Sequence, residues 1–362
     1  MSLRVALDWT PNANHVGFYV AAAKGWASLV LLSPDRDAYT TTPAKAVLSG
    51  EADLAVTPTE TAIAYACPKD GTDPVDGIDP SLVSVAALLQ KDTSALAALA
   101  TPKEGRKAIT RPCDLDGALY ASYAARYEGA IVRAVVRADG GKGEVLEETP
   151  PKLDCFTRVL EGKADATWIF RQHEGVQASR LGVELRTWSV GDFGVPYGYS
   201  PVLLAQTSLL SSRKEELRAL LTGVARGYVY AATHPIEAAD ILRTFSAQKT
   251  LEDADFFRAS VAAVAPFLLD EHGKWGRQDE KVWEGFLSFL KGQGLLPAKS
   301  PQASKLFTNE CLSEYHARSP SRSRRRVPRF ALRPTPSLAH SRGPLRDMRV
   351  MRDMSGEECD TI

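Results

Sequence analysis

Five short segments of the sequence carry aromatic and polar side chains that could bind a flat ring. Aromatic faces stack on such a ring, while carboxyl, amide and hydroxyl groups bond to its edge. The candidate binding residues are Trp9, Asn12, His15, Thr57, Glu60, Ser122, Tyr123, Tyr127, Trp168, Glu174, Tyr197 and Tyr199. The sequence therefore predicts a small-molecule site.

Several of these residues also have a structural alternative. Trp9 and Trp168 could pack in the core next to their strands. His15 could cap its own loop through a backbone hydrogen bond. Glu60 lies three residues after Thr57, a spacing that fits a capping box. The coincidence of five such segments in one chain favours the binding site.

The segments alternate with expected strands and helices. Short apolar runs predict strands at residues 3–9, 29–32, 54–56, 83–90, 119–123 and 166–170. Helical patterns occur at residues 16–24, 43–49, 57–66, 128–138, 215–230, 235–245, 254–268 and 279–291. This alternation predicts parallel α/β sheets, whose ligands bind beyond the carboxyl ends of the strands.

The loop from Ser122 to Tyr127 precedes the helix expected at residues 128–138. Backbone N–H groups at a helix N-terminus bind anions, so this loop could receive a phosphate. Arg126 and Glu128 could instead lie on a solvated helix face.

The composition excludes several classes of protein. The 362 residues include 44 Lys plus Arg, 44 Asp plus Glu and 44% hydrophobic residues, which is typical of a globular chain of about two domains. No run reaches the roughly 18 apolar residues of a membrane span, so we expect no membrane partner. Eleven Arg lie in residues 318–362, and the acidic remainder argues against nucleic-acid binding.

Standard catalytic and metal-binding motifs are absent from the sequence. The five cysteines are scattered, without a C-x-x-C pair or a His at ligand spacing. No P-loop, dinucleotide-binding, zinc-protease or nucleophile-elbow motif occurs. We therefore expect no metal and no cofactor. The N-terminus lacks the pattern of a secretion signal, which predicts a cytoplasmic protein.

The first binding segment points to a family. Residues 7–25, LDWTPNANHVGFYVAAAKG, resemble the opening motif of the thiamine-pyrimidine synthase-like family of the type II periplasmic-binding-protein superfamily. The resemblance covers about residues 3–312 and continues through residues 50–56, 122–128, 164–168, 197–202, 294–296 and 306–310.

The resemblance implies a two-lobed α/β fold with a ligand cleft between the lobes. Lobe one would comprise residues 1–90 and 200–312, and lobe two residues 91–199. The chain would cross between them near residues 90–98 and 191–200. Residues 313–362 would form a disordered basic tail.

The family contains binding proteins and synthases. Bacterial transport members bind formylaminopyrimidines, whereas fungal members make the phosphorylated hydroxymethylpyrimidine of thiamine from pyridoxal phosphate and one of their own histidines. The synthase resemblance implies a lysine, a histidine and an iron-binding cysteine cluster. Thr57, Thr61 and Tyr197–Ser200 occupy these places, which leaves no amine for the aldehyde and no thiolates for iron.

The resemblance therefore implies a cytosolic protein that binds a pyrimidine precursor of thiamine, linked to thiamine biosynthesis or salvage. Trp9, Tyr197 and Tyr199 would stack on the ring and Glu174 would bond to its edge. The protein could form a homodimer.

The alternative is an enzyme acting on the same pyrimidine. It would be an active hydroxymethylpyrimidine phosphate synthase, or a hydrolase or transferase with His15 or His173 and Glu174 as acid and base. Pyridoxal phosphate and iron belong only to the synthase. An inactive paralogue is the third reading.

Overall fold

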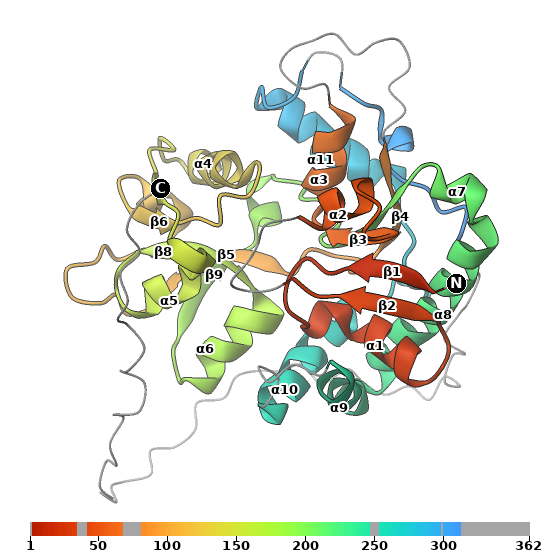
Figure 1. Ribbon diagram of the computed structural model, residues 1–362. Coiled ribbons are helices and arrows are strands. Elements are labelled where there is room, and N and C mark those ends of the chain that lie inside the picture. Colours follow the sequence, from red (N-terminus) through yellow and green to blue (C-terminus); the bar gives the residue numbers. More distant parts are fainter. Residues whose placement is uncertain (1, 35–41, 68–80, 247–252, 298–299, 313–362) are drawn as a thin grey trace, which may run out of the picture. The chain divides into compact units, whose positions relative to one another are not determined.

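The computed structural model describes residues 2–34, 42–67, 81–246, 253–297 and 300–312, all within one compact unit of the chain. Among these residues the strands form two five-stranded sheets, flanked by helices (Figure 1). The basic tail predicted for residues 313–362 lies outside the described residues.

The first sheet has the strand order β2-β1-β3-β10-β4. Its strands are β1 (Leu3–Ala6), β2 (Leu29–Leu32), β3 (Leu54–Thr57), β4 (Leu82–Ala87) and β10 (Val202–Gln206). Every residue of β3 and β4 is buried, because these short apolar strands lie inside the sheet or beneath helices on both faces.

The second sheet has the order β7-β6-β8-β5-β9. Its strands are β5 (Ser94–Leu99), β6 (Leu119–Ala121), β7 (Leu146–Glu148), β8 (Ala166–Phe170) and β9 (Leu185–Trp188). All its strands fall within residues 91–199, and those of the first sheet fall outside that range. The lobe boundaries themselves stay a prediction.

Both sheets are mixed, so the prediction of parallel sheets holds for β1, β2 and β3 and for β6, β7 and β8 but not for the remaining pairs. β10 runs antiparallel to β3 and β4, and β5 runs antiparallel to β8 and β9. These two are the first strands after the chain crosses between sheets, at residues 88–93 and 189–201. Each of these two strands begins where the neighbouring strands have their carboxyl ends, and it runs in the opposite direction to them. The first crossing is shorter than predicted, because residues 94–99 already form β5.

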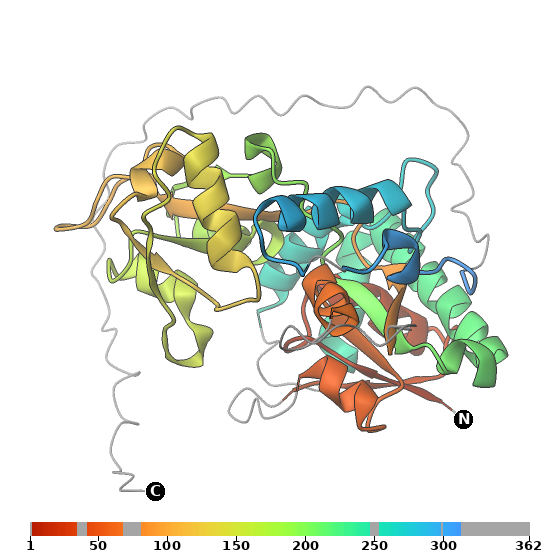
Figure 2. The same ribbon diagram turned by 90° about the horizontal axis from the view of Figure 1, so that it is seen from above.

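Three groups of helices cover the sheets, and Figure 2 shows them from above. In the first sheet, β1, β2 and β3 are followed by α1 (Val16–Ala23), α2 (Pro43–Leu48) and α3 (Thr59–Ala66), respectively. The second sheet carries α4 (Glu128–Ala138), α5 (Cys155–Leu160) and α6 (Val176–Arg180). The C-terminal helices are α7 (Leu209–Ser212), α8 (Lys214–Thr233), α9 (Pro235–Phe245), α10 (Ala254–Val264) and α11 (Glu280–Gly292).

Most of the helices match the sequence-based expectation, and one ends early. α4 and α9 have the predicted bounds. α10 stops at Val264, before the predicted Leu268, because Ala265–Phe267 form a 3-10 turn that contains Pro266. Proline cannot donate the backbone hydrogen bond that would continue an α-helix.

Helices α1 and α8 pack with their backbones in close approach. A Cβ atom at Gly227 would lie 2.0 Å from the carbonyl oxygen of Gly17, and a Cβ atom at Gly17 would lie 2.1 Å from the ring of Tyr228. The two glycines therefore fix the distance between the helices. Since α1 directly follows the first binding segment, this contact also positions the loop of residues 8–15.

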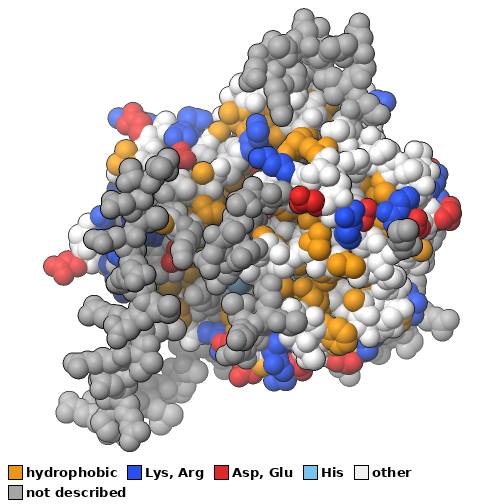
Figure 3. All heavy atoms as spheres, viewed as in Figure 1, with side chains coloured by type: hydrophobic (Ala, Val, Ile, Leu, Met, Phe, Trp, Pro, Cys, Tyr) orange, Lys and Arg blue, Asp and Glu red, His pale blue; other side chains and the backbone are white. Residues whose placement is uncertain are grey.

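The described surface mixes both signs of charge. Figure 3 shows blue and red side chains interspersed on one face, with hydrophobic side chains between them. In the described part of the chain, no helix has the length and apolar character needed to cross a membrane.

Candidate functional site

The predicted binding residues lie where strands of both sheets meet the crossings. Trp9, Asn12 and His15 follow β1, and Thr57 ends β3. Trp168 lies in β8 and Glu174 in the π-helical turn that follows it. The remaining residues lie in α3 (Glu60), in the loop between β6 and α4 (Ser122, Tyr123 and Tyr127) and in the crossing before β10 (Tyr197 and Tyr199).

Tyr197 connects the two sheets at the centre of this region. Its hydroxyl group donates a hydrogen bond to Glu60 Oε1 over 2.6 Å. Its ring lies 5.5 Å from that of Trp168, at an interplanar angle of 58°, and 5.3 Å from that of Phe286 on α11. A carboxyl group from the first sheet's α3 and an indole from the second sheet thus contact the same tyrosine.

The capping-box alternative for Glu60 is wrong. Helix α3 begins at Thr59 with Pro58 as its N-cap, and no side chain caps it. The Glu60 side chain points instead toward Tyr197 and is buried. Pro58 takes the N-cap position, and because proline has no side-chain oxygen it cannot accept the hydrogen bond of a capping box.

Five buried polar atoms at these strand ends have no hydrogen-bond partner among the described residues. They are Thr57 Oγ1, Glu60 Oε2, Gln90 Nε2, Thr93 Oγ1 and Gln172 Oε1. Most buried polar atoms in proteins are hydrogen-bonded, so each exception requires an explanation. Their concentration around the two crossings and the ends of β3 and β8 indicates where a polar ligand would bond.

Sequence reasoning missed three of these residues. Gln90 and Thr93 lie in the first crossing, and Gln172 lies two residues after β8. No aromatic neighbour or motif marked them. The rule that selected Thr57, a polar residue at the carboxyl end of an apolar strand, would have found Gln90 and Gln172 as well.

The Glu60 carboxyl group lies in an acidic environment. Burial raises its pKa above the ordinary value, the hydrogen bond from Tyr197 lowers it, and the nearby Asp92 and Glu128 carboxyl groups raise it further. Burial also raises the pKa of Asp92 and of Glu128. Desolvation disfavours the charged form of each acid, so these groups hold their protons to a higher pH than exposed carboxyl groups.

The loop before α4 leaves few backbone donors for a phosphate. Glu128 accepts hydrogen bonds from the backbone N–H groups of Tyr123 and Ala125, over 3.3 and 3.1 Å. Ser122 Oγ accepts one from Ala124 N over 3.0 Å. The predicted phosphate role is therefore wrong for these N–H groups, and Glu128 lies buried rather than on a solvated helix face.

His15 holds the loop after β1. Its Nδ1 accepts a hydrogen bond from Asn12 N over 3.3 Å, and its Nε2 lies 2.7 Å from Asp8 Oδ1. The ring is fully buried. This geometry confirms the loop-capping alternative for His15. Asn12 also accepts a hydrogen bond from Asn14 N, and Trp9 is half-buried in the same loop.

The other candidates differ in how far their polar atoms are engaged. Glu174 Oε2 accepts a hydrogen bond from Phe170 N over 2.8 Å. The hydroxyl group of the buried Tyr199 accepts one from Asp279 N over 2.9 Å. Trp168 is buried as well, whereas Tyr123 and Tyr127 are half-buried.

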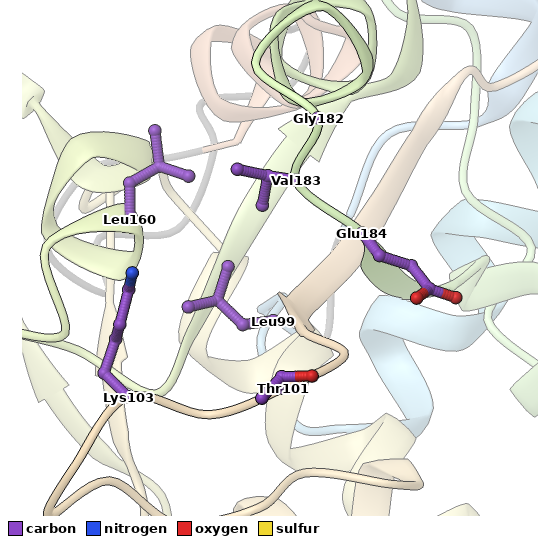
Figure 4. A pocket seen from close by; sticks show the side chains of 7 residues that line it. All are labelled: Leu99, Thr101, Lys103, Leu160, Gly182, Val183 and Glu184. Carbon is purple, nitrogen blue, oxygen red and sulfur yellow. The ribbon is translucent and has the colours of Figure 1, made fainter. Parts of the chain in front are cut away.

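A separate hollow of about 320 Å³ lies at the other end of β5. Figure 4 shows Leu99, Leu160 and Val183 beside Lys103 and Glu184. Leu99 is the last residue of β5, whereas the candidate site lies beside the first residue, Ser94. This hollow contains none of the predicted binding residues.

The described residues do not fit the groups that a synthase needs. Thr57 offers a hydroxyl group where the resemblance implies a lysine amine. Cys67, Cys113, Cys155 and Cys311 lie on separate elements, and burial raises the pKa of Cys155 to about 12, which keeps its thiol protonated. In the described ranges, no group of three or more His, Cys, Asp or Glu side chains is arranged to hold a metal ion.

A comparison with family models identifies the chain. Residues 12–238 match the NMT1/THI5-like family. The chain belongs to this family. It is also 25% identical, over 298 residues, to the formylaminopyrimidine-binding protein of Halalkalibacterium halodurans, an alignment that covers 80% of this chain and 84% of the relative.

Solved structures of binding proteins share the fold of this NMT1/THI5-like chain. The alkanesulfonate-binding protein SsuA of Xanthomonas axonopodis pv. citri matches with a TM-score of 0.60 and 12% identity, over 84% of this chain and 97% of that one. The periplasmic nitrate-binding protein NrtA of Synechocystis PCC 6803 matches with a TM-score of 0.55 and 13% identity, over 86% of each chain. The chain thus has the predicted α/β fold of type II periplasmic-binding proteins.

Proposed function

We propose that this protein binds an uncharged pyrimidine where the two sheets face each other. The observation that carries the proposal is the ring pair at Tyr197 together with the unpartnered polar atoms that follow β3 and β8. The Trp168 ring lies beside the Tyr197 ring, and buried polar atoms of Thr57, Glu60 and Gln172 have no partner among the described residues. Aromatic rings with a few convergent polar groups are typical of sites for planar ligands.

The unpartnered atoms suit a ring that both donates and accepts hydrogen bonds. Gln172 Oε1 is an acceptor, Gln90 Nε2 is a donor and the Thr57 hydroxyl group can act as either. An aminopyrimidine presents ring nitrogens as acceptors and an exocyclic amino group as donor. Glu174 remains the proposed carboxylate for the amino edge, since only its Oε2 is engaged by Phe170.

The charges around the site argue against an anionic ligand. After burial, the largest effects on the pKa of the Glu60 carboxyl come from Tyr197, the backbone N–H of Glu60, Asp92 and Glu128, none of which is positively charged. The guanidinium group of Arg171 is directed to Thr187 and Ser189, each over 2.9 Å. Arg171 acts on Asp92 and Arg126 on Tyr127, but the buried carboxyl groups of Glu60, Asp92 and Glu128 would oppose a sulfonate or nitrate ion here. The similarity to sulfonate- and nitrate-binding structures supports the fold alone, whereas the formylaminopyrimidine-binding relative supports a pyrimidine.

The similarity to the formylaminopyrimidine-binding protein also suggests a physiological role, which we propose here. A protein that binds a formylaminopyrimidine or hydroxymethylpyrimidine would serve thiamine biosynthesis or salvage. We propose that it does so non-covalently in the cytosol, without a cofactor, as a monomer or homodimer.

Isothermal titration calorimetry of the full chain tests this proposal. The ligands are hydroxymethylpyrimidine, its phosphate, formylaminopyrimidine, an alkanesulfonate and nitrate. We expect saturable binding of the unphosphorylated pyrimidines and weaker binding of the phosphate, because the backbone N–H groups before α4 are occupied. Binding of the sulfonate or nitrate alone, or of none of the five, would contradict the proposal.

A further inference from the structure

We propose that Glu60 acts in this site as a neutral carboxylic acid, whose Oε2 atom carries a proton and donates a hydrogen bond to an acceptor atom of the bound ring. The inference rests on the proposed function for the identity of the acceptor. The protonation itself can be measured without any ligand.

The geometry around Glu60 gives its carboxyl group one side-chain donor, Tyr197, besides the backbone N–H group of Glu60 itself. The side chain is 6% exposed, and Oε1 receives the hydroxyl hydrogen of Tyr197 over 2.6 Å. Oε2 is buried and has no partner in the described part of the chain. A buried carboxylate that stays ionised usually has several donors or a cation, and without them the group neutralises.

The neighbouring elements supply mainly acids and phenols to this position, while Arg171 acts on Asp92 and Arg126 on Tyr127. The crossing before β5 contributes Asp92, whose Oδ1 accepts hydrogen bonds from Ser94 N and Oγ over 2.9 and 2.6 Å. Helix α4 contributes Glu128, with Tyr127 at its N-cap. Each negative charge nearby makes the ionisation of Glu60 more costly, and burial, which raises the Glu60 pKa most, acts in the same direction.

The position of the proton follows from the hydrogen bond already made. Because Tyr197 donates to Oε1, that atom acts as the acceptor of the acid, and the proton lies on Oε2. A protonated carboxyl group has one O–H donor. The ligand atom that meets it must therefore be an acceptor, such as an unprotonated ring nitrogen, while the Gln172 Oε1 atom can accept from a ligand amino group.

Infrared difference spectroscopy of the ligand-free full chain tests the protonation. The spectrum of the wild type minus that of Glu60→Gln should contain the carbonyl stretching band of a protonated carboxyl group at pH 7. Glu51→Gln changes an exposed carboxyl group before β3 and should give no such band. A Glu60 difference spectrum that shows only carboxylate bands overturns the proposal.

Calorimetry with hydroxymethylpyrimidine tests the donated hydrogen bond. Glu60→Gln retains a donor and should keep the affinity within about threefold, whereas Glu60→Ala should lower it about tenfold. The wild-type affinity should fall as the pH rises through the Glu60 pKa, and that of Glu60→Gln should not. Affinity that rises with pH, or equal losses in the two variants, overturns the proposal.

The two experiments separate this inference from the proposed function. If the wild type binds no pyrimidine, the proposed function fails and the role of Glu60 toward a ring acceptor fails with it, while the infrared band still decides whether Glu60 is neutral. If pyrimidine binds but the band is absent, the proposed function stands and only the neutral acid is rejected.

Discussion

The side-chain amide of Gln172 donates a hydrogen bond to Asn14 Oδ1 over 2.9 Å. This contact joins the π-helical turn after β8 to the loop after β1. The backbone carbonyl oxygen of Gln172 also accepts a hydrogen bond from Ser260 Oγ on α10 over 2.5 Å. A single buried residue after β8 thus binds both the loop after β1 and helix α10, and its own Oε1 atom has no partner among the described residues.

Removal of the Gln172 amide should weaken ligand binding more than folding. Gln172→Ala deletes both the link to Asn14 and the Oε1 atom proposed to contact the ligand, so we expect the pyrimidine affinity to fall about tenfold. Asn14→Ala deletes the link alone and should lower the affinity less. Calorimetry measures both effects, and thermal unfolding shows whether each variant remains folded.

The double variant that combines Gln172→Ala with Asn14→Ala tests whether the hydrogen bond between the two residues contributes to ligand affinity. In a double-mutant cycle, contacting residues have a coupling free energy, here about 1 kcal/mol. Additive losses of binding free energy would mean that the Gln172–Asn14 hydrogen bond does not contribute to ligand binding.

The buried Glu60 should make stability depend on pH. When unfolded, Glu60 titrates near about 4.3, and burial raises its pKa in the folded protein. Between these two values the folded state binds more protons, so the free energy of unfolding falls as the pH rises, by about 1.4 kcal/mol for each unit of pKa elevation.

Glu60→Gln removes this dependence because an amide does not titrate. The melting temperature of the variant should exceed that of the wild type at pH 8, and the difference should shrink as the pH falls toward 4.5. Glu51→Gln serves as the matched control on an exposed site and should show no such trend. A difference that grows toward low pH would contradict a raised Glu60 pKa.

The sequence predicted several strands and helices, but it predicted no strand at β5, β7, β9 or β10. α4, α9 and β8 have the expected bounds. It could not show the antiparallel direction of β5 and β10, because strand direction depends on where the chain crosses between the sheets. Nothing in the residues of β10 themselves distinguishes a parallel from an antiparallel neighbour.

The roles of individual site residues were harder to predict than the site's location. The side chains of Glu60 and His15 each had two readings in the sequence. The structure gives Glu60 the contact with Tyr197, 137 positions away, and His15 a purely local contact with Asn12. Sequence spacing describes local hydrogen bonds such as caps, but it contains no information about which distant side chain will compete for the same atom.

The close approach of α1 and α8 gives a prediction about stability. Gly227→Ala would place a Cβ atom 2.0 Å from the Gly17 carbonyl oxygen, and a backbone atom cannot move away without shifting α1. We expect a loss of about 1–3 kcal/mol in the free energy of unfolding, measured by urea denaturation. Gly292→Ala, in α11 with no heavy atom within 4 Å of the added carbon, should be neutral or slightly stabilising.

Displacement of α1 should also reach the binding site. The helix follows the loop of residues 8–15, so a Gly227→Ala protein that still folds should bind the pyrimidine more weakly than Gly292→Ala does. Equal affinities would show that the position of this loop does not matter for binding.

Tyr197 combines a ring contact and a hydroxyl donor, and two substitutions separate them. Tyr197→Phe keeps the ring beside Trp168 and Phe286 but removes the hydrogen bond to Glu60. Tyr197→Ala removes both. Since an aromatic pair contributes about 0.5–1.5 kcal/mol beyond its buried area, we expect Tyr197→Ala to lower the pyrimidine affinity by a further two- to tenfold relative to Tyr197→Phe.

A tyrosine outside the site provides the control for this pair. Tyr230 on α8 stacks on His234, with ring centroids 4.4 Å apart, and its ring also contacts Trp26 and Lys24, neither of which is a candidate binding residue. Tyr230→Phe and Tyr230→Ala should leave the affinity measured by calorimetry unchanged. If Tyr197→Phe lost as much affinity as Tyr197→Ala, the hydroxyl group rather than the ring would be the contribution of Tyr197, and the site would recognise its ligand through the Glu60 hydrogen bond alone.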